Sequence, residues 1–244
     1  MRITDGIQSA GMDMDAVLMI GQSNMAGRGE IELVPPIRDP RCFMLRNGRW
    51  QPMREPVNPD RPIFEGKYRS GVSLAASFAE DYAKHFDANV GLIPCADGGT
   101  SLSEWMPGGL LYDHAVCLTG LAQRTSQLKA IIWHQGENDC ASDELVESYP
   151  QRFAAMITQL RRDLQAEDVP VILGEISLDI PERWCGGRQA RLNQMLHTIP
   201  DTVPNCAVAS AKDLPLKPDQ LHFNAEACRS FGRRYFEKYL TLTK

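Results

Sequence analysis

Long apolar runs and an excess of positive charge are both missing from this sequence of 244 residues. No stretch approaches the roughly 18 apolar residues that a membrane helix needs. The formal net charge is −5, so neither nucleic acid nor an anionic membrane would be attracted to this surface over a long range. We therefore expect neither nucleic acid nor a membrane as the main partner.

Paired cysteines and a secretory leader are missing as well. The seven cysteines are scattered and odd in number, and none forms a C-x-x-C pair. Such usage is typical of reduced, mostly buried thiols and indicates a cytoplasmic protein. Residues 1–13 hold one arginine but no apolar core, so we expect a flexible lead-in rather than a signal peptide. A secreted protein is the alternative if a leader has been removed from the sequence.

The sequence also has no arrangement typical of a metal site. His134, Asp139 and Cys140 stand close together, but no second pair of ligands follows at the spacing of a zinc site. We expect no metal and no cofactor. The sequence gives no indication of an oligomeric state.

What is present is an alternation of strand and helix patterns. Hydrophobic residues make up 43% of the chain and charged residues 23%, as in an ordinary globular domain. The expected strands span 15–20, 89–95, 129–135, 170–176 and 205–210. Helical spacing of apolar residues recurs over 74–82, 153–164 and 228–239, the second with Pro150 in its first turn. The alternation predicts a single α/β domain over 1–244, with a parallel sheet between helices.

The first expected strand ends in a polar turn, "VLMIGQSNMAG" (17–27). Ligands of open α/β sheets bind at the carboxyl ends of the strands, and Ser23 stands there as a helix N-cap or as a nucleophile. The stretch 28–68 follows directly and is rich in proline and arginine. Long irregular connections are usually functional loops or disordered segments, so it is either a wall of the site or a surface excursion.

Three more polar blocks follow the second, third and fifth strands: "ADGGTSLSEW" (96–105), "IIWHQGENDC" (131–140) and "DLPLKPDQLHFNAEA" (213–227). Glycines let backbone N–H groups approach a ligand closely. Asp219 and His222, three positions apart, can place a carboxylate against the imidazole Nδ1. A hydroxyl, a base with its acid, and amide donors at one sheet edge are what acyl transfer through an oxyanion requires. The four blocks together therefore predict that Ser23 is a nucleophile.

Four motifs, taken in this order, resemble the sequence blocks of SGNH hydrolases: GQSNMAG, GGTS, WHQGEND and DQLHF. More narrowly, they resemble the sialate O-acetylesterase domain and carbohydrate esterase family 6, which includes acetylxylan esterases. The resemblance spans residues 17–227, nearly the whole chain. It implies a flavodoxin-like, three-layer α/β/α sandwich, here with a five-stranded parallel sheet. It also implies metal-independent hydrolysis of O-acetyl groups on sugars by Ser23, Asp219 and His222.

The resemblance also implies an oxyanion hole. Its donors would be the amide of Ser23, the amide of Gly98 with Gly99 as the alternative, and a side chain of the third block. The acetylesterase branch uses the glutamine of HQGE, which is Gln135 here. The wider superfamily reads Gly-x-Asn-Asp in this block and uses the asparagine, which is Asn138. We favour Gln135 and keep Asn138 as the alternative.

Further residues are candidates for contacts with the sugar. Trp105 and Arg69 are two candidates, since aromatic faces suit pyranose rings, and either could equally be a packing or surface residue. Glu137 is a third candidate, and with Asp139 it is expected to order the loop rather than to do chemistry.

The sequence thus predicts a serine esterase that removes O-acetyl groups from carbohydrates of the acetylxylan or O-acetylated sialic acid type, through an acetyl-serine intermediate. One alternative is a short-chain lipase-like or thioesterase-like enzyme of the same superfamily. Another is a carbohydrate-binding protein that has lost catalysis.

Overall fold

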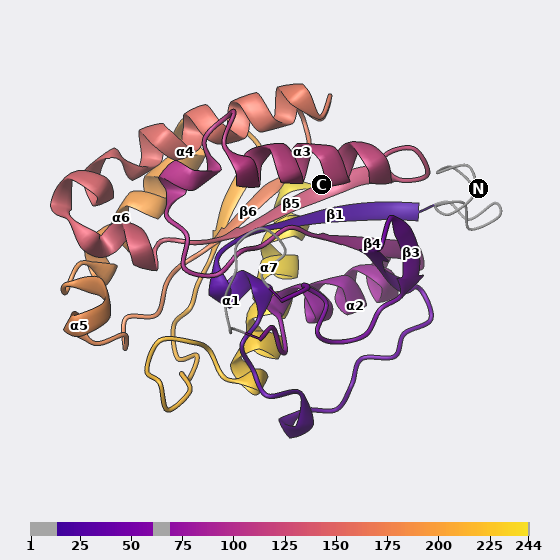
Figure 1. Ribbon diagram of the computed structural model, residues 1–244, viewed down its shortest axis with the longest axis horizontal. Coiled ribbons are helices and arrows are strands. Elements are labelled where there is room, and N and C mark those ends of the chain that lie inside the picture. The colour runs from indigo at the N-terminus through magenta and orange to yellow at the C-terminus, as the bar shows by residue number, and fades with distance from the viewer. Residues whose placement is uncertain (1–13, 61–68, 244) are drawn as a thin grey trace.

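The computed structural model describes residues 14–60 and 69–243, and its centre is a seven-stranded sheet (Figure 1). The strand order is β3-β2-β4-β1-β5-β6-β7. The strands are β1 (Met14–Gly21), β2 (Cys42–Arg46), β3 (Arg49–Pro52), β4 (Asn89–Pro94), β5 (Gln127–His134), β6 (Val171–Gly174) and β7 (Cys206–Ala209). The expected lead-in over 1–13 lies outside the described residues, as does the part 61–68 of the irregular stretch.

The expectation of five parallel strands was incomplete. All five expected strands are present, but β2 and β3 add an antiparallel hairpin from within the stretch 28–68, and β2 pairs in parallel with β4. Asn47 and Gly48 connect them, both with positive φ. Asn-Gly between short β-prone runs is a hairpin signal, so the sequence did carry this information.

Helices cover both faces of the sheet. Figure 1 shows α3 and α4 on one face and α2 and α7 on the other. The helices are α1 (Ser23–Ala26), α2 (Leu74–Phe86), α3 (Leu110–Ala122), α4 (Asp143–Asp163), α5 (Glu182–Cys185), α6 (Gln189–Thr198) and α7 (Ala225–Leu242). Short 3₁₀ turns are η2 (Ile31–Leu33), η3 (Leu102–Trp105), η4 (Glu137–Ala141) and η5 (Ile199–Asp201). One apolar core fills each side of the sheet, which makes the three-layer α/β/α sandwich that the sequence predicted.

Helix α4 corrects one expectation of detail. It begins at Asp143 after the N-cap Ser142, whose hydroxyl accepts a hydrogen bond from the Leu145 N–H at 3.2 Å. Pro150 therefore lies inside the helix rather than in its first turn, and it cannot donate the usual bond to the preceding turn. The buried face of α4, which includes Tyr149 and Phe153, packs into the core and offsets this loss. Neither α4 nor any other helix in the described parts of the chain is long and apolar enough to cross a bilayer.

Strand β1 lies at the point where the order of the strands changes direction. Its neighbours are β4 on one side and β5 on the other. After β1 the chain builds β2 and the edge strand β3, returns to β4 beside β1, and then crosses to β5, β6 and β7 on the other side. The loops that follow β1, β4 and β5 therefore meet at one edge of the sheet. Such a switch point is where open α/β sheets bind ligands.

Candidate active site

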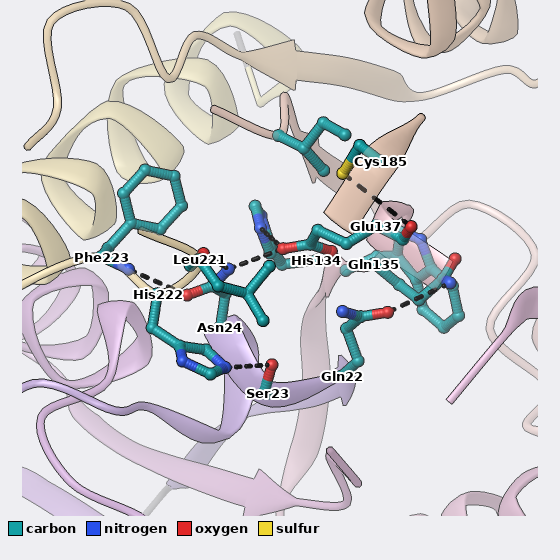
Figure 2. Close-up of polar contacts among 12 residues, drawn as sticks. Gln22, Ser23, Asn24, His134, Gln135, Glu137, Cys185, Leu221, His222 and Phe223 are labelled. Carbon is teal, nitrogen blue, oxygen red and sulfur yellow. Dashed lines mark hydrogen bonds and ion pairs between the residues drawn. The ribbon is translucent and has the colours of Figure 1, made fainter. Parts of the chain in front are cut away.

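A chain of two hydrogen bonds joins Ser23, His222 and Asp219 at this edge. The Oγ of Ser23 is 2.9 Å from His222 Nε2 (Figure 2). On the far side of the ring, His222 Nδ1 is 2.9 Å from Asp219 Oδ2. The other oxygen, Asp219 Oδ1, accepts the backbone N–H groups of Leu221 and His222, both at 3.0 Å. With Nδ1–H directed at Asp219, Nε2 is left to accept the serine proton.

The surroundings of Asp219 keep its carboxylate ionised. Partial burial would raise its pKa, but hydrogen bonds from the backbone and ring of His222 and from the Leu221 N–H outweigh burial and hold the pKa below its usual range. The Asp219 side chain is 41% exposed and the His222 side chain 16%. The pair therefore stands at the rim of the site, where an ionised carboxylate can stabilise an imidazolium.

The turn after β1 brings Ser23 to His222. Gly21 has φ +128°, and a Cβ there would lie 2.1 Å from the carbonyl oxygen of His134, so only glycine fits so close to β5. The next amide, Gln22 N–H, donates to the same carbonyl at 2.9 Å. Ser23 then begins α1, with Gln22 in the N-cap position. The hydroxyl of Ser23 thus does not cap a helix but meets the imidazole.

The second block brings Gly98 against Ser23. A Cβ on Gly98 would lie 3.4 Å from the Cβ of Ser23 and 2.5 Å from Nη2 of Arg28, whereas a Cβ on Gly99 would meet no other atom within 4 Å. Gly98 is therefore the glycine that lies next to the serine. Asn58 supports this block from the irregular stretch, because its amide bonds both the N–H of Ala96, at 3.1 Å, and the C=O of Ala96, at 2.9 Å.

The third block turns most of its polar side chains inward, and Gln135 is the main surprise. Gln135 is fully buried, and its Nε2 donates to Asp139 Oδ2 at 2.7 Å and to the Thr100 carbonyl at 3.1 Å. Its Oε1 accepts from the Tyr149 hydroxyl at 2.8 Å. Both amide hydrogens are thereby used inside the protein. The geometry contradicts the expectation that Gln135 donates to an oxyanion.

Asn138 is the member of this block that stays exposed at the site. It borders the same cavity as Ser23, of about 620 Å³, and its Nδ2 donates to the Gly99 carbonyl at 2.6 Å. This bond uses one of its two amide hydrogens. Gln22 also borders the cavity, and its Oε1 accepts a long bond of 3.3 Å from Gln135. Two side-chain amides therefore reach the space beside Ser23, and Gln135 is not one of them.

Of the three expected sugar contacts, the structure brings only Arg69 to the cavity with an exposed side chain. Trp105 is 1% exposed, and its indole N–H donates to the Thr100 hydroxyl at 3.1 Å inside the core, which corrects that expectation. Glu137 borders the cavity but is only 4% exposed, and its carboxylate is bonded to Asn24. A sugar contact by Glu137 is therefore not supported.

Several residues at the cavity were not found from the sequence. Trp184, on α5, lines the cavity and is 49% exposed; its signal was an aromatic residue in a loop-rich segment, "PERWCGG". Arg28 and Lys217 add positive charge to the same wall. Arg28 is the first residue of the irregular stretch 28–68 and the one residue that the described part of this stretch contributes to the wall, whereas Arg69 lies just beyond the stretch.

Comparisons with known proteins agree on one family. Residues 13–241 match the model of the family described as carbohydrate esterase, sialic acid-specific acetylesterase. The chain is 32% identical to a probable carbohydrate esterase of Arabidopsis thaliana, over 92% of this chain and 89% of that protein.

Solved structures show the same fold. An X-ray structure of an Arabidopsis thaliana protein matches with a TM-score of 0.83 at 29% identity, over 93% of this chain and 98% of that one. NanS matches with a TM-score of 0.73 at 18% identity, over 97% and 99%. A carbohydrate acetylesterase from Xanthomonas citri matches with a TM-score of 0.64 at 19% identity, over 94% of this chain and 56% of that one. At such identities the last two comparisons support the fold alone.

Proposed function

Because this chain belongs to the carbohydrate esterase, sialic acid-specific acetylesterase family, we propose that it is a serine esterase that removes O-acetyl groups from sugars. The substrates would be of the acetylxylan or O-acetylated sialic acid type. The observation that carries the proposal is the run of two 2.9 Å contacts from Ser23 through His222 to Asp219 at the edge of an open cavity.

The proposed reaction has two halves. His222 Nε2 takes the proton of Ser23 as Oγ attacks the acetyl carbonyl, and the sugar alcohol then leaves with that proton, so that the acetyl group stays on Ser23. In the second half, His222 takes a proton from water, the water attacks the acetyl-serine, and acetate leaves as Ser23 regains its proton. Asp219 keeps the imidazole in the required tautomer throughout.

The negative charge on the carbonyl oxygen needs donors in each half. The backbone N–H of Ser23 is free of helical partners, as at the start of any helix, and the Gly98 N–H belongs to the glycine that lies against Ser23. For the side-chain donor we now propose Asn138, since it borders the cavity and has a second amide hydrogen beyond its bond to Gly99. Gln22 is the other amide in reach.

The test is acetate release from a panel of purified substrates. We expect turnover of at least one of acetylated xylan oligomers, O-acetylated sialic acids and aryl acetates, and its loss in Ser23→Ala with the fold retained. Sugar binding without any turnover by the wild-type protein would favour a carbohydrate-binding function instead.

A second candidate rests on the apolar part of the cavity wall. Trp184 and Leu221 both line it, so a lipase-like or thioesterase-like enzyme that acts on acyl chains longer than acetyl is the competing proposal. Each CH₂ that finds an apolar trough gains up to about 0.8 kcal/mol. We expect activity on p-nitrophenyl esters to fall steeply from acetate to octanoate, and a flat or rising series would favour the acyl-chain enzyme.

A further inference from the structure

Asn24 follows Ser23 directly, yet its side chain leads away from the cavity. Its Oδ1 accepts the N–H of Phe223 at 3.1 Å, and its Nδ2 lies 3.3 Å from the carbonyl oxygen of Leu221. Leu221 and Phe223 are the two neighbours of His222 in the chain. One buried side chain, 1% exposed, thus holds the backbone on both sides of the proposed base (Figure 2).

Glu137 reinforces the orientation of the Asn24 amide that the Phe223 N–H and the Leu221 carbonyl also favour. Its Oε1 accepts from Asn24 Nδ2 at 2.6 Å, in a contact buried from solvent. A carboxylate only accepts hydrogen bonds, so the NH₂ group of Asn24 must face Glu137 and the Oδ1 must face the Phe223 N–H. Without the carboxylate, the amide of Asn24 would lose its strongest partner, and the long 3.3 Å contact to the Leu221 carbonyl would be left to hold its NH₂ group.

The surroundings of Glu137 favour its charged form. His134 Nε2 faces Glu137 Oε1 at 3.8 Å, and the other ring nitrogen, Nδ1, lies 3.1 Å from the Tyr235 hydroxyl. Burial would raise the pKa of Glu137, but its interactions with His134 and Asn24 outweigh burial and lower that pKa. An ionised acceptor makes the bond to Asn24 a strong, charge-assisted one.

We propose that Glu137 and Asn24 are positioning residues for the esterase reaction: the buried carboxylate orients the asparagine amide, and the amide clamps the loop that carries His222 opposite Ser23. The inference rests on the proposed function, because it takes His222 to be the base. It also explains why Ser23 and Asn24 are adjacent. One turn of chain fixes both the nucleophile and the loop that holds its base, so that neither can shift without the other.

The experiment is a double-mutant cycle with Asn24→Ala, Glu137→Ala and the double variant, assayed for kcat and KM on an aryl acetate. A base misplaced by about 1 Å costs on the order of 10²-fold, so we expect each single variant to lose about that factor in kcat with KM unchanged. Because Glu137 acts through Asn24, the double variant should be no worse than Asn24→Ala alone. Glu137→Gln keeps an oxygen for Asn24 and should recover about tenfold over Glu137→Ala.

Asn193→Ala is the matched control. Asn193 is also buried and also clamps backbone, bonding the N–H and C=O of Ile176 at 3.0 and 2.9 Å, but it does not touch the His222 loop. We expect it to lower the melting temperature as Asn24→Ala does while leaving kcat unchanged. Folded Glu137→Ala with wild-type kcat, or losses that multiply in the double variant, would overturn the proposal.

A second readout separates this proposal from the function on which it rests. A fluorophosphonate probe labels Ser23 only as fast as His222 activates it, and it needs no sugar or acetyl specificity. If the wild-type protein turns over no acetyl ester, the labelling rates of the same variants still test the clamp. Equal labelling in the wild type, Asn24→Ala and Glu137→Ala would overturn the clamp, whatever the substrate.

Discussion

The rim of the cavity and the polar layer beneath it are built from the same sequence blocks but are chemically opposite. We use "polar layer" for Asn24, His134, Gln135, Glu137 and Asp139, all of them buried. Neighbours in sequence differ between the two regions: Ser23, Asn138 and Glu137 all border the cavity, but Glu137 is only 4% exposed and bonds to Asn24, the buried neighbour of Ser23.

For Gln135 and Asp139 the difference lies in how far the hydrogen-bonding capacity of each group is used, although Glu137 Oε2 and His134 Nε2 in the same layer have no hydrogen-bond partner among the described residues. In the polar layer, Gln135 donates both amide hydrogens to acceptors inside the protein. Asp139 accepts from Gln135, the Leu102 N–H and Arg152. At the rim, the Ser23 hydroxyl faces a single imidazole and Asn138 keeps one amide hydrogen. A substrate can only use groups whose partners are incomplete, so the type of a side chain does not reveal its role, whereas its remaining capacity does.

The sharpest way to break this contrast is Ser23→Ala, at the rim. Loss of the hydroxyl should lower kcat/KM on an acetyl ester by about 10⁴-fold or more. The melting temperature should hardly change, since the Ser23 hydroxyl supports no other part of the fold. A folded variant with retained turnover would remove Ser23 from the mechanism.

Asn138→Ala should give the next largest effect. If Asn138 is the side-chain donor to the oxyanion, kcat should fall by roughly 10²–10³ with little change in KM, because the bond matures in the transition state. Steady-state kinetics on an aryl acetate measures both constants. Gln22→Ala is the companion variant, and a kcat defect there with Asn138→Ala unaffected would make Gln22 the donor.

Gln135→Ala should behave in the opposite way, as a member of the polar layer. It takes one of three donors from Asp139 and removes the Gln135 donor from the Thr100 carbonyl, and an unmet buried acceptor costs about 1–3 kcal/mol in the free energy of unfolding. Its kcat should stay close to that of the wild type in the folded protein. Urea unfolding and steady-state kinetics on one preparation test both parts, and a large kcat defect at unchanged stability would restore Gln135 as the donor.

Trp184 at the cavity and the buried Trp105 repeat the contrast, with a smaller expected effect on activity. Trp184→Ala removes an exposed ring from the cavity and should cost roughly 1 kcal/mol of contact, which is about fivefold in KM for an acetylated oligosaccharide. Trp184→Phe should restore most of it. Leu178→Ala, also exposed at 62% but away from the cavity wall, serves as the control. An unchanged KM in Trp184→Ala would exclude a sugar contact there.

The smallest effect concerns the pH dependence of stability. Glu137 and Asp219 both have lowered pKa values in the folded protein, so the stability each contributes is complete above its unfolded pKa and is lost as the pH falls through the folded one. The stability advantage of the wild type over Glu137→Gln should therefore vanish on acidification. The stability advantage over Asp219→Asn should change in the same direction but be smaller, since the Asp219 side chain is 41% exposed to solvent. Urea unfolding at a series of acidic pH values measures both, and an advantage that grows on acidification would contradict the assignment.

The features that depend on the pattern of apolar and polar residues could be predicted from the sequence. Apolar periodicity located the five core strands, and the positions of the polar blocks at strand ends brought Ser23, Asp219 and His222 together. What it could not predict was the direction of side chains within a block. Gln135 and Asn138 both follow β5, and only the packing of Tyr149 from α4 and the turn at Thr100 direct one inward. Trp105 failed for the same reason, since an aromatic residue suits a sugar and a core equally well.

The β2–β3 hairpin has a consequence for how molecules of this protein meet one another. It ends the sheet in a strand of four residues, Arg49–Pro52, and β7 at the other end is equally short. A foreign strand adds to a sheet through a row of unpaired N–H and C=O groups. Here the edge strand is brief, starts at a charged arginine and stops at a proline that has no N–H to offer. A variant with Arg49→Val and Pro52→Val would present an edge strand with a longer run of backbone groups open to pairing. Concentrated solutions of this variant should aggregate more than the wild-type protein.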